Sequence, residues 1–281
     1  MTSCLAKVFS MVMNQRLITF CIKHSLIDER QASHKKGVRT SDNVFILRTL
    51  FDKYCTQKKG KLYACFVDFR KAFDSIWHEA LFLKLLRKNI GGPFYRVIKS
   101  MYDQTCTALK IDGNLTERFH VYSGVRQGDI LSPILFNIFI DDIVKEFNNL
   151  ECSPPSLIEE TVGSLLYADD LVILSTTAEG LQNSIDKLSS YCTRWKMQIN
   201  MNKTKTMCFQ KTGNHSKLKI KYNATVLEQV KNYPYLGIEV CSNGSFNQAE
   251  LNMTAKAKKA LFKIQGLLYR SNIKPNLSLR I

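Results

Sequence analysis

The stretch from Leu165 to Leu174 constrains the fold of this chain more than any other. Two adjacent carboxylates, Asp169 and Asp170, separate two apolar runs that are each long enough to form a strand. The simplest interpretation is a tight hairpin with both aspartates at its turn. A carboxylate held against an apolar hairpin loses hydration and is repelled by its neighbour, so such a pair tends to take up protons or to bind a cation. An ordinary polar turn is the alternative.

A second carboxylate upstream favours the cation site. Residues 64–67 are apolar and lead into Asp68, which therefore ends a predicted buried strand. Two strands that each deliver carboxylates to one edge of a sheet can hold a pair of hard cations. Mg²⁺ fits this description because it is usually bound through one or two carboxylates, several waters and substrate phosphates. Two such ions can clamp the attacking and leaving oxygens of a phosphoryl displacement.

The composition predicts a globular protein with a polyanionic partner. Hydrophobic residues make up 45% of the 281 residues and charged residues 23%, a balance that excludes a disordered chain. Lys and Arg number 40 against 24 Asp and Glu, and the resulting charge of +16 favours nucleic acid as the partner over dispersed charge on a basic nuclear protein. Nine cysteines without a C-x-x-C pair predict reduced thiols, no zinc site and an intracellular location, in the cytoplasm or the nucleus. We expect neither a signal peptide nor a membrane span.

Hydrophobic spacing predicts most of the secondary structure. Helices are expected over residues 5–22, 43–54, 75–88, 94–101 and 181–195, with another beginning near Ser132 and a basic amphipathic one near residues 256–268. In the first helix, Val8, Phe9, Val12, Met13 and Leu17 are expected on one side. A hairpin is expected around Asp112-Gly113-Asn114, and a strand over residues 197–200.

Several motifs, in their usual order, resemble those of reverse transcriptases, most closely the enzymes of non-LTR (LINE-type) retrotransposons. In chain order they are Phe66-Val67-Asp68 with Ala72-Phe73-Asp74, Ser123 to Pro133 around Gln127-Gly128, and Tyr167-Ala168-Asp169-Asp170. Later segments resemble the fourth palm motif, at Lys203, and the primer-grip turn, at Tyr233 to Gly237. The resemblance extends from about Ser3 to about Val240. A palm from an intron maturase or a telomerase is the other polymerase candidate.

The resemblance implies an α+β fold of the right-hand polymerase type, with fingers, palm and a partial thumb, and with a mostly antiparallel palm sheet backed by helices. Partial fingers are expected in residues 1–60, the palm in residues 61–240, where fingers elements can interleave, and the start of a thumb-like helical segment in residues 241–281. The sequence resembles such a domain truncated at both ends, so we expect weak or poorly processive activity.

The implied activity is RNA-directed DNA polymerisation on an RNA template with a DNA primer and dNTPs. It would use two Mg²⁺ ions, or Mn²⁺, held by Asp68, Asp169 and Asp170. The residues expected at the nucleotide are Phe69, Phe73, Gln127, Gly128 and Lys203. Of these, Phe73 would screen the sugar 2′ position, unless it is simply a core residue. The residues expected at nucleic acid are Lys35, Lys36, Arg39, Tyr235, Gly237, Lys256, Lys259 and Lys263. The alternative function is a vestigial retroelement fragment that only binds RNA or DNA.

Overall fold

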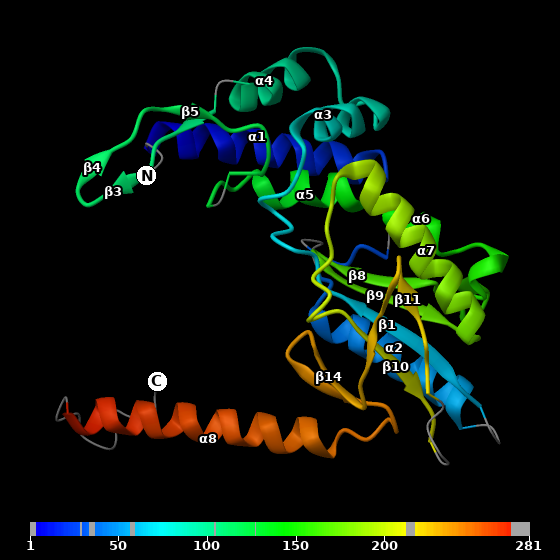
Figure 1. Ribbon diagram of the computed structural model, residues 1–281. Coiled ribbons are helices and arrows are strands. Elements are labelled where there is room, and N and C mark those ends of the chain that lie inside the picture. Colours follow the sequence, from blue (N-terminus) through cyan, green and yellow to red (C-terminus); the bar gives the residue numbers. More distant parts are fainter. Residues whose placement is uncertain are drawn as a thin grey trace.

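A five-stranded sheet forms the centre of this computed structural model, in the strand order β13-β10-β1-β9-β8 (Figure 1). The middle strand β1 (Leu62–Val67) pairs antiparallel with both β10 (Lys205–Phe209) and β9 (Asp170–Ser175). β8 (Ser164–Tyr167) continues the antiparallel pairing at β9, and β13 (Glu228–Gln229) lies parallel to β10. The structure describes residues 4–28, 30–33, 37–56, 60–103, 105–126, 128–211 and 217–270, with side chains as far as residue 264.

Side-chain alternation along the strands gives the sheet two apolar faces. Cys65 and Val67 face a core that they share with α3 (His78–Arg87), α5 (Ser132–Ile140) and α7 (Ala178–Trp195). Ala64 and Phe66 face the other core, which α2 (Thr40–Cys55) covers. Helices therefore back the sheet on both sides, and the strands between them are almost wholly apolar, as the sequence predicts for β1.

Shorter elements surround this frame. The remaining helical segments are α1 (Cys4–Lys23), α4 (Gly92–Asp103), α6 (Ile143–Glu146), η1 (Leu150–Cys152) and α8 (Asn247–Arg270). The small antiparallel ribbons are β2 (Cys106–Thr107) with β5 (Phe119–His120), β3 (Lys110–Ile111) with β4 (Asn114–Leu115), β6 (Ser156–Leu157) with β7 (Glu160–Thr161), β11 (Lys221–Tyr222) with β12 (Thr225–Val226), and β14 (Asn232–Tyr235) with β15 (Ile238–Cys241).

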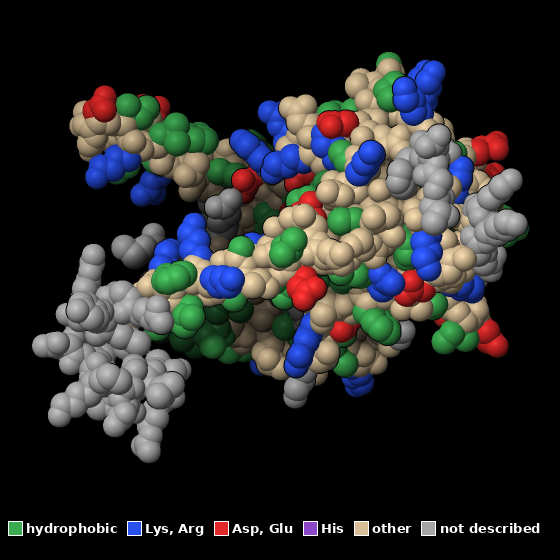
Figure 2. Space-filling view, turned by 90° about the horizontal axis from the view of Figure 1, so that it is seen from below, with side chains coloured by type: hydrophobic (Ala, Val, Ile, Leu, Met, Phe, Trp, Pro, Cys, Tyr) green, Lys and Arg blue, Asp and Glu red, His purple; other side chains and the backbone are tan. Residues whose placement is uncertain are grey.

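Two elements stand away from the sheet on the same side of the molecule (Figure 1). One is the ribbon of β2 to β5, whose tip has positive φ at both Asp112 (48°) and Gly113 (88°), the condition for the type I′ turn that Asp-Gly favours. The other is α8, whose lysine and apolar side chains are exposed. Figure 2 views the molecule from below and shows Lys and Arg side chains scattered over that face instead of gathered in one patch.

Most predicted elements are present, and three details need correction. Met13 and Leu17 are buried in α1, but Val8, Phe9 and Val12 are exposed, because the buried stripe runs through Ser10 and Cys21 instead. Residues 197–200 form a single bridge, between Ile199 and Phe69, and no full strand. The helix predicted over residues 75–88 begins at His78, since turns occupy residues 70–75.

Within the described residues, α1 has the length and apolar composition that would allow it to cross a membrane, and 22% of that window is buried in the structure. Core helices and N-terminal signal sequences share these properties, so they do not by themselves indicate a membrane. Met13, Leu17 and Cys21 of α1 pack into the main core. The absence of a membrane span stays a prediction.

Candidate active site

Strand register brings Asp68 to the same end of the sheet as the aspartate pair. In the antiparallel pairing of β1 with β9, Val67 lies opposite Leu171. Asp68 follows Val67 and Asp170 precedes Leu171, so each carboxylate stands one residue beyond this pair on neighbouring strands. The backbone of Asp68 is fixed on its other side: its N–H donates to Thr204 Oγ1 (3.2 Å), and its carbonyl accepts a hydrogen bond from a backbone N–H of the segment before β10.

The hairpin turn is displaced by one residue from the prediction. Tyr167 pairs with Asp170, so Ala168 and Asp169 form the two-residue turn and Asp170 is already the first residue of β9. Ala168 has a φ of 54°. This left-handed conformation costs a residue other than glycine about 1–2 kcal/mol. Asp169 is half-buried beside the turn, and Asp170 is exposed.

The carboxylates repel one another. Burial raises the pKa of Asp169, and the charge of Asp68 raises it further against one opposing backbone hydrogen bond. Although Asp170 is exposed at the surface, the protein atoms around it remove part of its hydration and raise its pKa, as do the charges of Asp169 and Asp68. All three side chains are therefore near enough to interact electrostatically. A cluster of like charges of this kind is relieved either by protonation or by a bound cation.

Lys203 brings a positive charge to the rim of this cluster. Its Nζ lies 3.7 Å from Asp68 Oδ1, and the Lys203 side chain is 68% exposed. An exposed ion pair of this length contributes little to stability. Lys203 therefore adds little to the stability of the fold, and its position matters mainly for the chemistry at the carboxylates.

Residues 1–240 match the family model described as reverse transcriptase (RNA-dependent DNA polymerase), a span that includes all three aspartates and the strands that carry them. The chain belongs to the reverse transcriptase family. Similar proteins confirm the non-LTR type of this reverse transcriptase domain. A probable RNA-directed DNA polymerase from transposon BS of Drosophila melanogaster is 27% identical over 293 residues, which cover 99% of this chain and 30% of that protein.

The polyprotein of a second retroelement is also similar to this reverse transcriptase. The retrovirus-related Pol polyprotein from type-1 retrotransposable element R2 of Nasonia vitripennis is 28% identical over 246 residues, covering 84% of this chain and 24% of that protein. The chain spans less than a third of the length of these two relatives.

A solved telomerase has the same fold. The telomerase of Candida tropicalis in complex with a TWJ fragment of telomeric RNA aligns with a TM-score of 0.60 and 16% identity, over 88% of this chain and 38% of that one. At this identity the likeness shows the fold alone, a reverse transcriptase and telomerase type of arrangement with mixed helices and strands. The similarity to retrotransposon proteins favours a retrotransposon reverse transcriptase over the intron maturase or telomerase, which was the other candidate from the sequence.

The donor set of the reverse transcriptase site fits a hard divalent cation. Within the described ranges, no group of three or more His, Cys, Asp or Glu side chains is placed so that it could hold a metal ion by itself. Reverse transcriptases use divalent metal ions, and Mg²⁺ in particular needs only one or two carboxylates besides waters and substrate phosphates. Asp68, Asp169 and Asp170 offer carboxylate oxygens at an open edge, and their mutual repulsion favours a cation there.

The residues expected at the nucleotide lie in different surroundings. Phe69 is 5% exposed and its side chain packs in the main core, so its place at the nucleotide stays a prediction that only its backbone could meet in this conformation. Phe73 is half-buried and stacks on Phe136, with ring centroids 4.4 Å apart and an interplanar angle of 21°. Gly128 is exposed and has a φ of 79°, a backbone conformation that suits glycine. Gln127 lies outside the described residues.

The residues expected to bind nucleic acid also differ in their exposure. Tyr235 is 2% exposed, and its hydroxyl accepts a hydrogen bond from Asn43 Nδ2 at 3.4 Å. Its ring is part of the core, and its contact with nucleic acid stays a prediction. Gly237 is exposed in the β14–β15 turn, and Arg39 is exposed at the start of α2. The three α8 lysines, Lys256, Lys259 and Lys263, are all exposed. Lys35 and Lys36 lie outside the described residues.

Sequence reasoning assigned no role to two residues that the fold brings to the site. Tyr233 is the half-buried tyrosine near the carboxylates: burial and then the charges of Asp68 and Asp170 raise the pKa of its hydroxyl to about 12. The charge of Asp170 also acts on the buried Tyr235. Gln31 contacts the backbone of Ala168 although the two lie 137 positions apart. A contact that distant in sequence leaves no local signal. Alternation along a strand places Tyr233 and Tyr235 on the same face, so spacing could not tell them apart.

Proposed function

We propose that this chain is the polymerase part of a non-LTR retrotransposon protein and that it carries out RNA-directed DNA synthesis. The observation that carries the proposal is the convergence of Asp68, Asp169 and Asp170 at one end of β1 and β9, where their charges repel one another. A template-directed nucleotidyl transferase needs a site of this kind, because its chemistry rests on positioning and on neutralising phosphate charge.

In this proposal the five-stranded sheet is the palm of a right-hand polymerase, within residues 61–240. Residues 1–60 contribute fingers, and residues 241–281 begin a thumb. The mostly antiparallel pairing of β10, β1, β9 and β8 supports the assignment of the palm. The exposed lysines of α8 support a thumb that follows a phosphate backbone, since such contacts supply most of the affinity for nucleic acid.

The carboxylates of Asp68 and Asp169 would hold Mg²⁺, with Asp170 at the exposed edge of the same cluster. Bound divalent ions supply activation of the primer 3′-hydroxyl and neutralisation of the triphosphate. Lys203, beside Asp68, is placed to donate a proton or a hydrogen bond to the leaving pyrophosphate. Phe73 would pack against the deoxyribose of the incoming dNTP, and the exposed backbone of Gly128 would permit close approach of a base or sugar. The template would be RNA and the primer DNA, in the cytoplasm or the nucleus.

Primer extension on poly(rA)/oligo(dT) with dTTP and Mg²⁺ tests the proposal. The wild-type chain should extend the primer, and Asp169→Asn should lower the rate by about 10²- to 10⁴-fold, because the ion that this side chain helps to hold is worth several kcal/mol to the transition state. Asp186→Asn is the matched control: it makes the same change at an exposed position of α7 and should keep full activity.

The outcome also separates polymerase from nucleic-acid-binding protein. A folded wild-type chain that binds the template–primer but extends nothing, with Mg²⁺ or Mn²⁺, would favour a protein that only binds RNA or DNA. If Asp169→Asn still extends the primer at the wild-type rate, the three carboxylates do not have the proposed role.

A further inference from the structure

Gln31 holds the backbone of the aspartate turn. The Ala168 N–H donates to Gln31 Oε1 at 3.1 Å, and Gln31 Nε2 lies 3.5 Å from the Ala168 carbonyl oxygen, so one amide faces both polar groups of one peptide residue. Gln31 is fully buried, at 0% exposure. Water cannot reach the Gln31 side of these contacts, although Ala168 itself is partly exposed. A backbone N–H that loses its partner in such surroundings is costly.

The residue held in this way is the strained one. Ala168 has a φ of 54°, and the next two residues along the chain are Asp169 and Asp170. An alanine adopts this left-handed conformation only where its surroundings impose it. If Ala168 relaxed to a right-handed or extended conformation, the turn would change direction and the two carboxylates would leave their place beside Asp68. The hydrogen bonds of Gln31 oppose that relaxation.

Gln31 is itself fixed along the edge of the sheet. It forms a parallel bridge with Leu166 of β8: the Ala32 N–H donates to the Leu166 carbonyl (2.9 Å), and the Leu166 N–H donates to the Arg30 carbonyl (3.3 Å). The buried hydroxyl of Ser33 also lies 3.0 Å from Gln31 Oε1. The amide therefore keeps one orientation relative to the turn.

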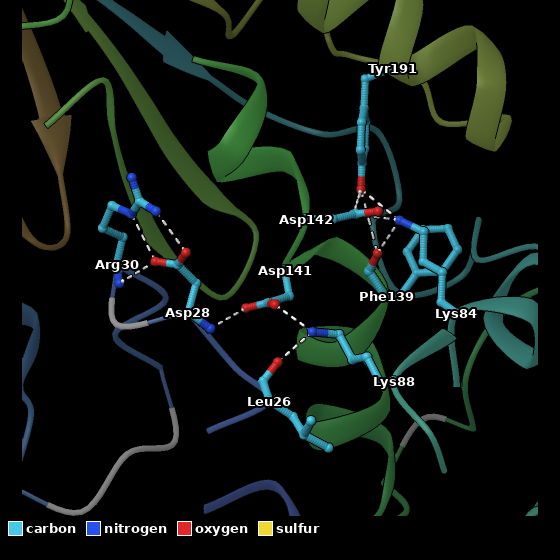
Figure 3. A network of polar contacts seen from close by, with 9 residues as sticks. All are labelled: Leu26, Asp28, Arg30, Lys84, Lys88, Phe139, Asp141, Asp142 and Tyr191. Carbon is cyan, nitrogen blue, oxygen red and sulfur yellow. Dashed lines mark hydrogen bonds and ion pairs between the residues drawn. The ribbon is translucent and has the colours of Figure 1, made fainter. Parts of the chain in front are cut away.

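Ion pairs and hydrogen bonds hold the residues just before Gln31 against the helices of the main core (Figure 3). The backbone N–H of Asp28 donates to Asp141 Oδ1 at 2.7 Å, and Asp141 Oδ2 pairs at 2.6 Å with Lys88, which follows α3 directly. Lys88 also donates to the carbonyl of Leu26, and Arg30 pairs with Asp28 at 2.7 Å. Asp141 is 2% exposed, so this anchor is buried. The residues around Asp28 are therefore held near α3 and the end of α5. This fixes the start of the segment that continues to Gln31 beside β8.

We propose that Gln31 is a positioning residue for the metal-binding carboxylates, which fixes the left-handed Ala168 and thereby the direction of Asp169 and Asp170. The inference rests on the proposed polymerase function, since it assigns these carboxylates to a divalent cation. Gln31 touches neither substrate nor metal. It acts through the backbone of the turn.

The test uses the full chain with two readouts, Mn²⁺ affinity from electron paramagnetic resonance and kcat with KM for dTTP from primer extension. Gln31→Met keeps the side-chain length but removes both polar atoms. It should weaken Mn²⁺ binding and lower kcat, each by about 10- to 100-fold, and leave KM for dTTP within about threefold. Gln31→Asn, whose amide is one methylene too short to reach Ala168, should show the same pattern and serves if Gln31→Met does not fold.

A rescue separates positioning from general stability. Glycine adopts positive φ without strain, so Ala168→Gly added to either Gln31 variant should restore at least about a third of the lost kcat on a logarithmic scale. The matched control is Gln210→Met, a buried glutamine just beyond β10, at the end of the β1–β10 pair away from Asp68. It should lower Tm without changing Mn²⁺ affinity.

The result that overturns the proposal is a folded Gln31→Met or Gln31→Asn with wild-type Mn²⁺ affinity and kcat, or a loss that Gln210→Met matches and Ala168→Gly does not relieve. A wild-type chain that binds Mn²⁺ without extending a primer would contradict the polymerase function, and Mn²⁺ affinity would still decide the role of Gln31.

Discussion

Asp68 and Asp170 stand side by side because Val67 and Leu171 are paired across β1 and β9. The two carboxylates come from segments of the chain that are far apart, and the register of the sheet alone sets their relative place. Any change that slipped β1 by one residue against β9 would turn Asp68 to the opposite face. The apolar residues that alternate between the two cores hold that register, so the packing of the sheet and the geometry of the site depend on the same strand pair.

The first prediction is that Asp169→Asn stabilises the metal-free protein while it removes activity. Burial and the charge of Asp68 raise the pKa of Asp169, so the folded state binds this proton more tightly than the unfolded chain does. The contribution of Asp169 to stability is therefore lost as pH rises through its folded pKa. At pH 7 without metal, Asn should raise Tm by about 1–3 °C, because partial exposure limits the effect to about 1 kcal/mol or less.

Thermal unfolding at pH 4 and pH 7, with EDTA and with 10 mM Mg²⁺, measures this effect. The difference in Tm between variant and wild type should shrink toward pH 4, where the wild-type carboxyl takes up its proton. Mg²⁺ should raise the Tm of the wild type more than that of the variant, since only binding to the folded state stabilises it. A lower Tm for Asp169→Asn in EDTA would show that Asp169 makes favourable contacts that outweigh the repulsion.

The second prediction concerns Phe73, which stacks on Phe136 and is half-buried. If its exposed part faces the sugar of the incoming nucleotide, Phe73→Val should raise incorporation of ribonucleotides relative to deoxyribonucleotides by about 5- to 150-fold, the equivalent of relieving about 1–3 kcal/mol of overpacking. Lost packing should also lower Tm. Steady-state incorporation of UTP and dTTP gives the ratio.

Phe136→Leu is the control for Phe73, because it removes the same ring stack from a fully buried position. It should lower Tm and leave the ratio of ribonucleotide to deoxyribonucleotide incorporation unchanged. An unchanged ratio in Phe73→Val as well would leave Phe73 as a packing residue only.

The sequence predicted the parts of this molecule whose signals are local. The aspartates at strand ends, the apolar run of β1 and the i, i+4 stripe of α7, with Leu181, Ile185 and Leu188 all buried, each follow from periodicity. Periodicity failed at α1, which is apolar nearly all round, so spacing could not choose the buried side. The role of Gln31 could not be predicted for a different reason: it depends on a partner that only the folded chain brings near.

Tyr233 and Tyr235 show the same limit of prediction from sequence for two residues of a single strand. Both lie on β14 and both rings contact Phe66, at centroid distances of 4.4 and 5.6 Å, so alternation places them on one face. Their different burial arises from Asn43 of α2, which packs at Tyr235, and α2 is remote from β14 in the sequence.

The third prediction is that the α8 lysines contribute to binding of the template–primer. Lys256, Lys259 and Lys263 are exposed and lie on a helix that leads away from the sheet (Figure 1). Replacing all three by Gln should weaken binding and reduce the slope of log K against log salt by up to about 2–3, one phosphate contact for each lysine. Tm should not change, since no fold contact is lost.

Fluorescence anisotropy of a labelled template–primer between 50 and 200 mM NaCl gives that slope. The matched control replaces Lys217, Lys219 and Lys221 by Gln, which removes the same charge from three exposed positions beside β11. An equal loss of affinity in both triple variants would mean that net charge, and not the place of α8, sets the binding.

The fourth prediction is a rise in stability with pH that depends on Lys84. This lysine is 3% exposed, pairs with Asp142 at 2.7 Å and donates to the Tyr191 hydroxyl (Figure 3). It also lies 4.0 Å from the ring centroid of Trp195. Burial lowers its pKa to about 8, against the opposing effect of Asp142. Above pH 8 the folded protein has released a proton that the unfolded chain still binds, so the contribution of Lys84 to stability should increase with pH. The window closes near pH 10, because Tyr191, whose pKa burial raises, then favours protonation in the folded state.

Urea denaturation between pH 7 and pH 10 should show the wild type gaining stability relative to Lys84→Met, which carries no proton to release, and relative to Lys84→Arg, which keeps its proton throughout. The buried cysteines, whose pKa burial raises, lower the stability of all three proteins alike over this range. A wild-type curve parallel to both variants would mean that Lys84 keeps its charge in the folded protein.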